Sequence, residues 1–158
     1  MEPTILTLDP QPVLFVRKTG VYQQAASEAW GVLMGFAYAN KLMTKETKTI
    51  GISYDSPDIT AEHKLRYDAC ITIVEAVTVE GEIDTQTIAG GKYAVFLHKG
   101  PYENFEQTYR AIYQDWLPHS GEQLRNIPVW ERYLNRDPRR TKPENLRTEI
   151  YIPIADQN

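Results

Sequence analysis

The stretch Lys18-Thr19-Gly20-Val21-Tyr22 returns 80 residues later as His98-Lys99-Gly100-Pro101-Tyr102. In both places a run rich in Val, Leu and Phe precedes the glycine, which is typical of a strand that ends there. In both places apolar residues near helical spacing follow the tyrosine, which indicates an amphipathic helix. The sequence therefore predicts the same strand–turn–helix unit twice.

Two further anchors repeat at almost the same distance. Gly51-Ile52-Ser53-Tyr54 matches Trp130-Glu131-Arg132-Tyr133 at an offset of 79, and Leu65-Arg66 matches Leu146-Arg147 at an offset of 81. Three anchors with a nearly constant offset indicate an internal repeat. We predict one domain, residues 1–158, made of two pseudo-symmetric halves at about 10–78 and 84–155.

Each half is predicted to contain a strand, a helix and two further strands. Because about 75 residues bury a sheet face poorly on their own, we expect the two halves to share a core. The predicted class is α+β, with antiparallel sheets, both helices on one side and a central groove along the pseudo-twofold axis. The predicted elements are strands at 13–19, 49–54, 67–74, 85–88, 93–98, 128–134 and 146–154, and helices at about 23–43 and 101–117.

Composition excludes several classes of function. The 158 residues are 42% hydrophobic and 24% charged with a formal net charge of −4, which disfavours direct nucleic-acid binding. The single Cys70 excludes an intrachain disulfide and is expected to be a buried, inert thiol. No phosphate-binding glycine motif is present, and His63, His98 and His119 lack metal-ligand spacing, so we expect neither cofactor nor metal. No apolar run suits a membrane span, and a cytoplasmic location is expected.

The candidate ligand-binding acids are Glu131 and Glu149. Each precedes a tyrosine by two residues, so Glu131 shares a strand face with Tyr133, and Glu149 shares one with Tyr151. Either glutamate alone is compatible with a solvent-facing position. The aromatic residues near Glu131 favour a site, because rings and a carboxylate together attract flat or cationic molecules.

Aromatic residues on the predicted helices are candidates to line the same cavity. Tyr109, Tyr113 and Trp116 belong to the second helix and Trp30 to the first. Such stripes are commonly core, but several Tyr and Trp side chains at one seam indicate a partly polar cavity. We expect Trp116, Tyr113, Tyr133 and Glu131 to line one cavity with Trp30, and burial and a nearby Glu149 to raise the pKa of Glu131.

The segment 132–147 carries six basic residues and two acidic ones. It is either a solvated loop or a contact surface for an acidic partner. Its basic members are Arg132, Arg136, Arg139, Arg140, Lys142 and Arg147.

The repeated motif before each helix, with Ile88-Ala89-Gly90-Gly91-Lys92-Tyr93-Ala94-Val95 and Trp130-Glu131-Arg132-Tyr133-Leu134-Asn135, resembles the GyrI-like small-molecule-binding family. The resemblance covers about residues 10–155. The family includes stand-alone DNA gyrase inhibitory proteins and effector-binding domains of AraC-type and MerR-type multidrug regulators. It implies two β-α-β-β (SHS2) modules and a groove for hydrophobic, aromatic or cationic drugs and toxins.

The resemblance also implies roles for particular residues. The family's central ligand-contacting acid matches Glu131, and an acid and an aromatic residue on its last strand match Glu149 and Tyr151. Three functions stay open: a stand-alone binding protein, an inhibitor or modulator of DNA gyrase, and a hydrolase of cyclopropane-bearing genotoxins with Glu131 as general base. About twelve residues precede the first predicted strand, so we expect no helix-turn-helix domain there and no direct transcription control by this chain alone.

Overall fold

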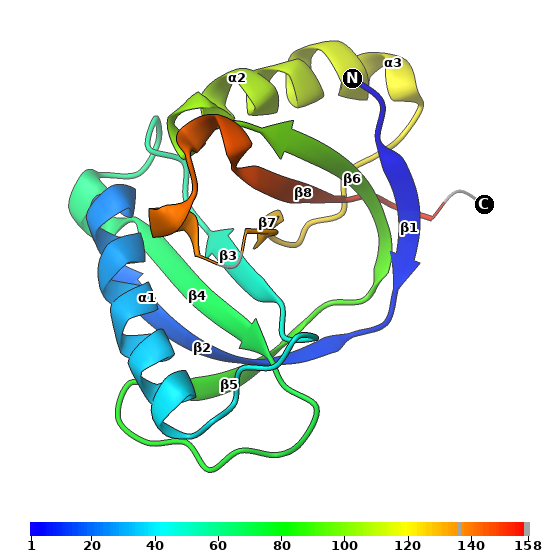
Figure 1. Ribbon diagram of the computed structural model, residues 1–158. Coiled ribbons are helices and arrows are strands. Elements are labelled where there is room, and N and C mark those ends of the chain that lie inside the picture. The colour runs from blue at the N-terminus through cyan, green and yellow to red at the C-terminus, as the bar shows by residue number, and fades with distance from the viewer. Residues whose placement is uncertain (136, 157–158) are drawn as a thin grey trace. The chain divides into compact units, whose positions relative to one another are not determined.

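The computed structural model describes residues 1–135 and 137–156 and has an α+β fold, as predicted. The chain divides into two units, each of which contains four antiparallel strands (Figure 1). The N-terminal unit comprises Pro10–Ala89, and the C-terminal unit comprises Met1–Asp9 with Gly90–Asn158. None of the described helices combines the length and apolarity that a membrane crossing requires.

The N-terminal unit packs one long helix against its sheet. In α1 the buried residues Ala25, Ala29, Leu33 and Ala37 recur every fourth position, so one narrow stripe of mostly small side chains faces the sheet. The sheet order is β3-β4-β2-β5. The bounds are β2 (Gln11–Thr19), α1 (Tyr22–Ala39), β3 (Thr49–Ser53), β4 (Arg66–Thr72) and β5 (Asp84–Ile88).

Helix α1 ends at Ala39, four residues before the predicted end. Lys41 has a φ of 55°, and the amide of Leu42 donates to the carbonyl of Ala37. A residue in the left-handed region at this place is a common helix terminator, because it turns the chain back onto the last carbonyls. Leu42 therefore packs against the core from outside the helix.

The C-terminal unit has the sheet order β1-β6-β8-β7. Its helical segment is irregular and packs Ile112 against Phe96, Ile150 and Ile152 of the sheet. The bounds are β1 (Thr4–Leu8), β6 (Gly91–Lys99), a 3-10 turn (Tyr102–Asn104), α2 (Phe105–Arg110), a π-helical turn (Ala111–Trp116), α3 (Leu117–Ser120), β7 (Trp130–Tyr133) and β8 (Arg147–Pro153).

The first strand of the chain, β1, is missing from the sequence prediction. Its side chains are mostly exposed and show no apolar alternation, so only pairing with β6 defines it. It lies 80 residues before β5, which pairs with β2. β1 precedes the first predicted half but pairs with β6 of the second half. β5 begins the second predicted half but pairs with β2 of the first half. Superposition of the two halves stays a prediction.

The Gly90-Gly91 pair connects β5 to β6. Gly91 has a φ of 106°, and a Cβ atom there would lie 2.8 Å from a guanidinium nitrogen of Arg125. That guanidinium donates to the carbonyls of Gly90 and Lys92. Only glycine suits both the backbone angle and the close approach.

A buried carboxylate ties the N-terminal sheet together. Asp68 on β4 is fully buried and accepts hydrogen bonds from the guanidinium of Arg17 at 2.7 and 3.0 Å. It also accepts from the Tyr54 hydroxyl at 2.7 Å and the Gln86 amide at 2.9 Å. These partners come from β2, β5 and the chain after β3, so one acid links three strands. Burial, with Asp68 alongside, raises the pKa of Tyr54 to about 12.

Replacing Asp68 with Ala should lower the free energy of unfolding by about 2–3 kcal/mol, because three donors lose their acceptor. Urea denaturation monitored by circular dichroism measures the change. The control Asp58→Ala removes an exposed acid and should stay within about 0.5 kcal/mol of the wild type. Equal effects of the two substitutions would show that the Asp68 network does not stabilise the sheet.

Candidate functional site

The carboxylate of Glu131 lies between two phenols of the C-terminal unit. Tyr109 donates to Oε1 at 2.7 Å, and Tyr133 donates to Oε2 at 3.1 Å. Side chains alternate along β7, so Glu131 and Tyr133 lie on the same face of the sheet. Ile150 of β8 is the register partner of Glu131 and lies on this face as well. Because Ile150 belongs to the core under the helical segment, Glu131 faces that segment.

Further aromatic rings extend this arrangement. The ring of Tyr102 lies 5.6 Å from that of Tyr133, and Phe105 lies edge-on to Tyr109 at 6.3 Å. Tyr113 stacks on Tyr109 at 6.3 Å with an interplanar angle of 12°. We call Glu131, Tyr133, Tyr109, Tyr113 and Tyr102 the Glu131 site. Tyr102 is its most exposed ring, at 36%.

Burial governs the electrostatics of the Glu131 site. It raises the pKa of Glu131 above its usual value of 4.5, although the two phenol hydrogen bonds act in the opposite direction. The predicted direction is confirmed, but Glu149 is not among the causes. Burial and the Glu131 carboxylate also raise the pKa of Tyr109 well above 10.0. Among the residues that the structure describes, no Lys or Arg forms an ion pair with Glu131.

The helical segment over Glu131 contains a π turn where the sequence predicts one continuous helix. Ala111–Trp116 has π-helical hydrogen bonding between α2 and α3. Pro118 follows, and its missing N–H and bulky ring disrupt the hydrogen bonds of a regular helix at this point. π turns are frequent at functional sites, and this one carries Tyr113 next to Tyr109.

The second predicted acid, Glu149, lies on the opposite face of the same sheet. Arg132 pairs with Glu149 and Trp130 with Tyr151 in the β7–β8 register, so these four side chains point away from Glu131. Glu149 accepts from the Tyr151 hydroxyl at 2.9 Å and lies 3.6 Å from the Arg132 guanidinium. The sheet thus separates the two predicted acid–tyrosine pairs.

Trp130 belongs to this opposite face and was not among the predicted site residues. Its ring stacks on Tyr151 at 3.8 Å, and its indole nitrogen has no hydrogen-bond partner among the described residues. Alternation alone indicates which face Trp130 occupies, but no sequence signal shows that its donor lacks an acceptor.

The two predicted tryptophans occupy different surroundings. Trp116 packs edge-on against Phe96 at 5.0 Å, in the core cluster that Tyr109 and Tyr113 also contact. Trp30 lies in the N-terminal unit, where its indole nitrogen donates to the Tyr67 hydroxyl at 2.9 Å. A contribution of Trp30 to the Glu131 site stays a prediction.

Cys70 and His98 are held within the fold. Cys70 is buried as predicted, and burial raises its thiol pKa. His98 bonds to the Thr108 hydroxyl and the Pro101 carbonyl. The described residues contain no cluster of three or more His, Cys, Asp and Glu side chains placed to hold a metal ion. Each Glu131 oxygen accepts one hydrogen bond from a phenol, which leaves one lone pair on each oxygen for the proton that a general base would take from water.

Several cations of the basic segment have partners within it. Arg139 and Arg140 lie 3.4 and 3.6 Å from the Asp137 carboxylate, and Arg147 donates to the Glu144 carbonyl. Arg136 lies outside the described residues.

Comparison with known proteins places the chain in a class and then in a family. The fold is that of α+β domains in which helices cover antiparallel sheets. Residues 1–155 match the model of the GyrI-like small molecule binding domain, so the chain belongs to this family. The predicted resemblance is confirmed.

Curated relatives carry two kinds of name. A probable transcriptional regulator, YgiV, from Escherichia coli K12 is 32% identical over 111 residues, which cover 70% of this chain and 69% of YgiV. A DNA gyrase inhibitor from Escherichia coli K12 is 29% identical over 120 residues, covering 73% of this chain and 74% of the relative.

Solved structures agree on the fold. The C-terminal domain of EcmrR superposes with a TM-score of 0.81 at 19% identity, covering 99% of this chain and 98% of that domain. This chain spans 57% of the EcmrR chain in an EcmrR–DNA complex, which superposes with a TM-score of 0.80. SAV2435 bound to tetraphenylphosphonium superposes with a TM-score of 0.63 at 20% identity, covering 98% of this chain and 94% of SAV2435.

The raised pKa of Glu131 predicts a specific pH dependence. A carboxyl that holds its proton more tightly in the folded state contributes stability at low pH, and this contribution is lost as pH rises from about 4.5 through the folded pKa. The stability of wild type minus that of Glu131→Gln should therefore fall with rising pH over this window. Thermal denaturation of both proteins between pH 4 and 7 measures it. A constant difference in melting temperature between the two proteins over this pH range would contradict the raised pKa of Glu131.

Proposed function

We propose that this protein captures aromatic, lipophilic organic cations at the Glu131 site. The observation that carries the proposal is a desolvated carboxylate among phenols with no Lys or Arg ion pair in the described chain. A cation with aromatic substituents supplies the missing positive charge and packs against the rings. Family membership and the tetraphenylphosphonium-bound neighbour support a ligand of this class.

The tyrosines provide the apolar surface and the hydrogen bonds of the proposed site. Tyr109 and Tyr133 hold the carboxylate, so its charge has a fixed position before a ligand arrives. Tyr102 is the most exposed ring of the site and lies where a ligand enters. Tyr113 stacks on Tyr109 and extends the aromatic surface. A neutral carboxylic acid offers little to a cation, so binding favours the ionised form of Glu131 and offsets the effect of burial.

The test compares a cation with a neutral molecule of similar shape. Tetraphenylphosphonium and triphenylphosphine oxide are titrated while tryptophan fluorescence is recorded. Glu131→Gln should weaken tetraphenylphosphonium binding by about 1–2 kcal/mol, the scale of a desolvated charge interaction, and should spare the phosphine oxide.

Glu149→Gln is the matched control, because it removes the same charge from the opposite face of the same strand pair. It should leave both affinities within about a factor of two, since Arg132 lies beside Glu149. A larger loss with Glu149→Gln than with Glu131→Gln would place the ligand on the other face. Equal losses for both probes with Glu131→Gln would show that the charge plays no part.

A contact with DNA gyrase is the second candidate function, and relatives named DNA gyrase inhibitor favour it. A gyrase supercoiling assay with added protein and no small molecule tests it. Inhibition that persists in Glu131→Gln would make the gyrase contact independent of the Glu131 site. Absence of any effect on supercoiling would remove this candidate.

A further inference from the structure

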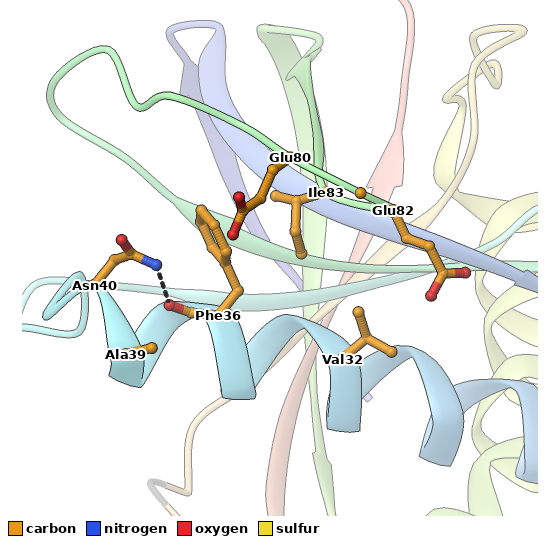
Figure 2. Close-up of a pocket in the computed structure, with 8 residues that line it drawn as sticks. Val32, Phe36, Ala39, Asn40, Glu80, Glu82 and Ile83 are labelled. Atoms are coloured by element: carbon orange, nitrogen blue, oxygen red, sulfur yellow. Dashed lines mark hydrogen bonds between the residues drawn. The ribbon is translucent and has the colours of Figure 1, made fainter.

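The N-terminal unit contains an open hollow whose lining includes none of the residues of the Glu131 site. It has a volume of about 510 Å³ and is largely open to solvent. Its apolar surface comes from Val32, Phe36 and Ala39 of α1 and from Ile83 on the segment before β5. Figure 2 shows Val32 and Phe36 on the helix, with Ile83 and Glu80 on the segment above them.

The rim of the hollow is negative. Glu80 and Glu82 both line it, but Glu82 lies 2.7 Å from the Lys18 ammonium group. Glu80 has no ion-pair partner in the described part of the chain, and Figure 2 shows its carboxylate on the side of the Phe36 ring. The Glu82 side chain points away from that ring (Figure 2).

The helix end adds to the negative potential. α1 ends at Ala39, which lines the hollow, and its last turn contains no basic residue. The carbonyl end of a helix carries up to about half a negative charge, and here hydrogen bonds from Asn40, Lys41 and Leu42 to the last carbonyls offset part of it. The uncompensated Glu80, the face of Phe36 and the helix end therefore attract positive charge at the same place.

We propose that this hollow binds an alkylammonium ion. The ammonium group lies at Glu80 and the Phe36 ring, and the alkyl chain covers Val32 and Ile83. A linear aliphatic chain suits the apolar part of the lining, which consists of three aliphatic side chains and one aromatic ring. This second site shares no residue with the Glu131 site, so it stands whether or not the proposed function holds.

The test is a titration of isotope-labelled protein with hexyltrimethylammonium, followed by amide chemical shifts. Glu131→Gln serves as the background, which keeps the two sites distinguishable. Saturable shifts are expected at the amides of Ala39 and Gly81. 1-Hexanol, which lacks the charge, should bind more weakly at the same amides.

Glu80→Gln should weaken hexyltrimethylammonium binding about two- to fivefold, the scale of an interaction with an exposed charge. Glu75→Gln removes a charge from the same loop outside the lining and should leave the affinity unchanged. Equal weakening by both variants, equal affinity for 1-hexanol, or no saturable shift would overturn the proposal. Concentration-dependent self-association that Val32→Lys abolishes would identify the hollow as a contact between copies and would overturn it as well.

Discussion

The desolvated charge of Glu131 is the interaction on which the functional account depends. Removing a carboxylate from water disfavours its ionised form, and two phenol hydrogen bonds offset only part of this effect, since the pKa stays raised. Among the described residues, the site contains no Lys or Arg whose positive charge offsets the remaining cost of desolvating the carboxylate. Under the proposed function, a ligand that carries its own positive charge supplies this offset, and the site then selects for charge rather than for one particular shape.

The carboxylate of Asp68 shows what a structural acid looks like in the same protein. Asp68 is fully buried, but it accepts four hydrogen bonds, two of them from a guanidinium. Its charge is balanced by the chain itself, so it stabilises the N-terminal sheet and leaves little for a ligand to gain. This contrast in hydrogen-bond partners is the physical ground on which we assign a structural role to Asp68 and propose a ligand-binding role for Glu131.

Strand alternation and the internal repeat allowed most of the fold to be predicted. The glycine turns, the first helix and the face shared by Glu131 and Tyr133 all follow from local patterns. Three features do not: β1 depends on pairing with a distant strand, the π turn arises within an apolar helical pattern, and the opposite faces of Glu131 and Glu149 depend on register. The hydrogen bonds of Asp68 could not be predicted from the sequence, because its partners Arg17, Tyr54 and Gln86 are far apart in the chain.

Proton release on binding tests the central claim most directly. If an organic cation binds beside the Glu131 carboxylate, it favours the ionised form and expels the proton that burial retains. Calorimetric titration with tetraphenylphosphonium at pH values from 4.5 upward, in buffers of different ionisation enthalpy, measures this release. The account predicts release of a fraction of a proton by wild type, and none by Glu131→Gln or with triphenylphosphine oxide. Cation binding by wild type with no proton release at any of these pH values would contradict it.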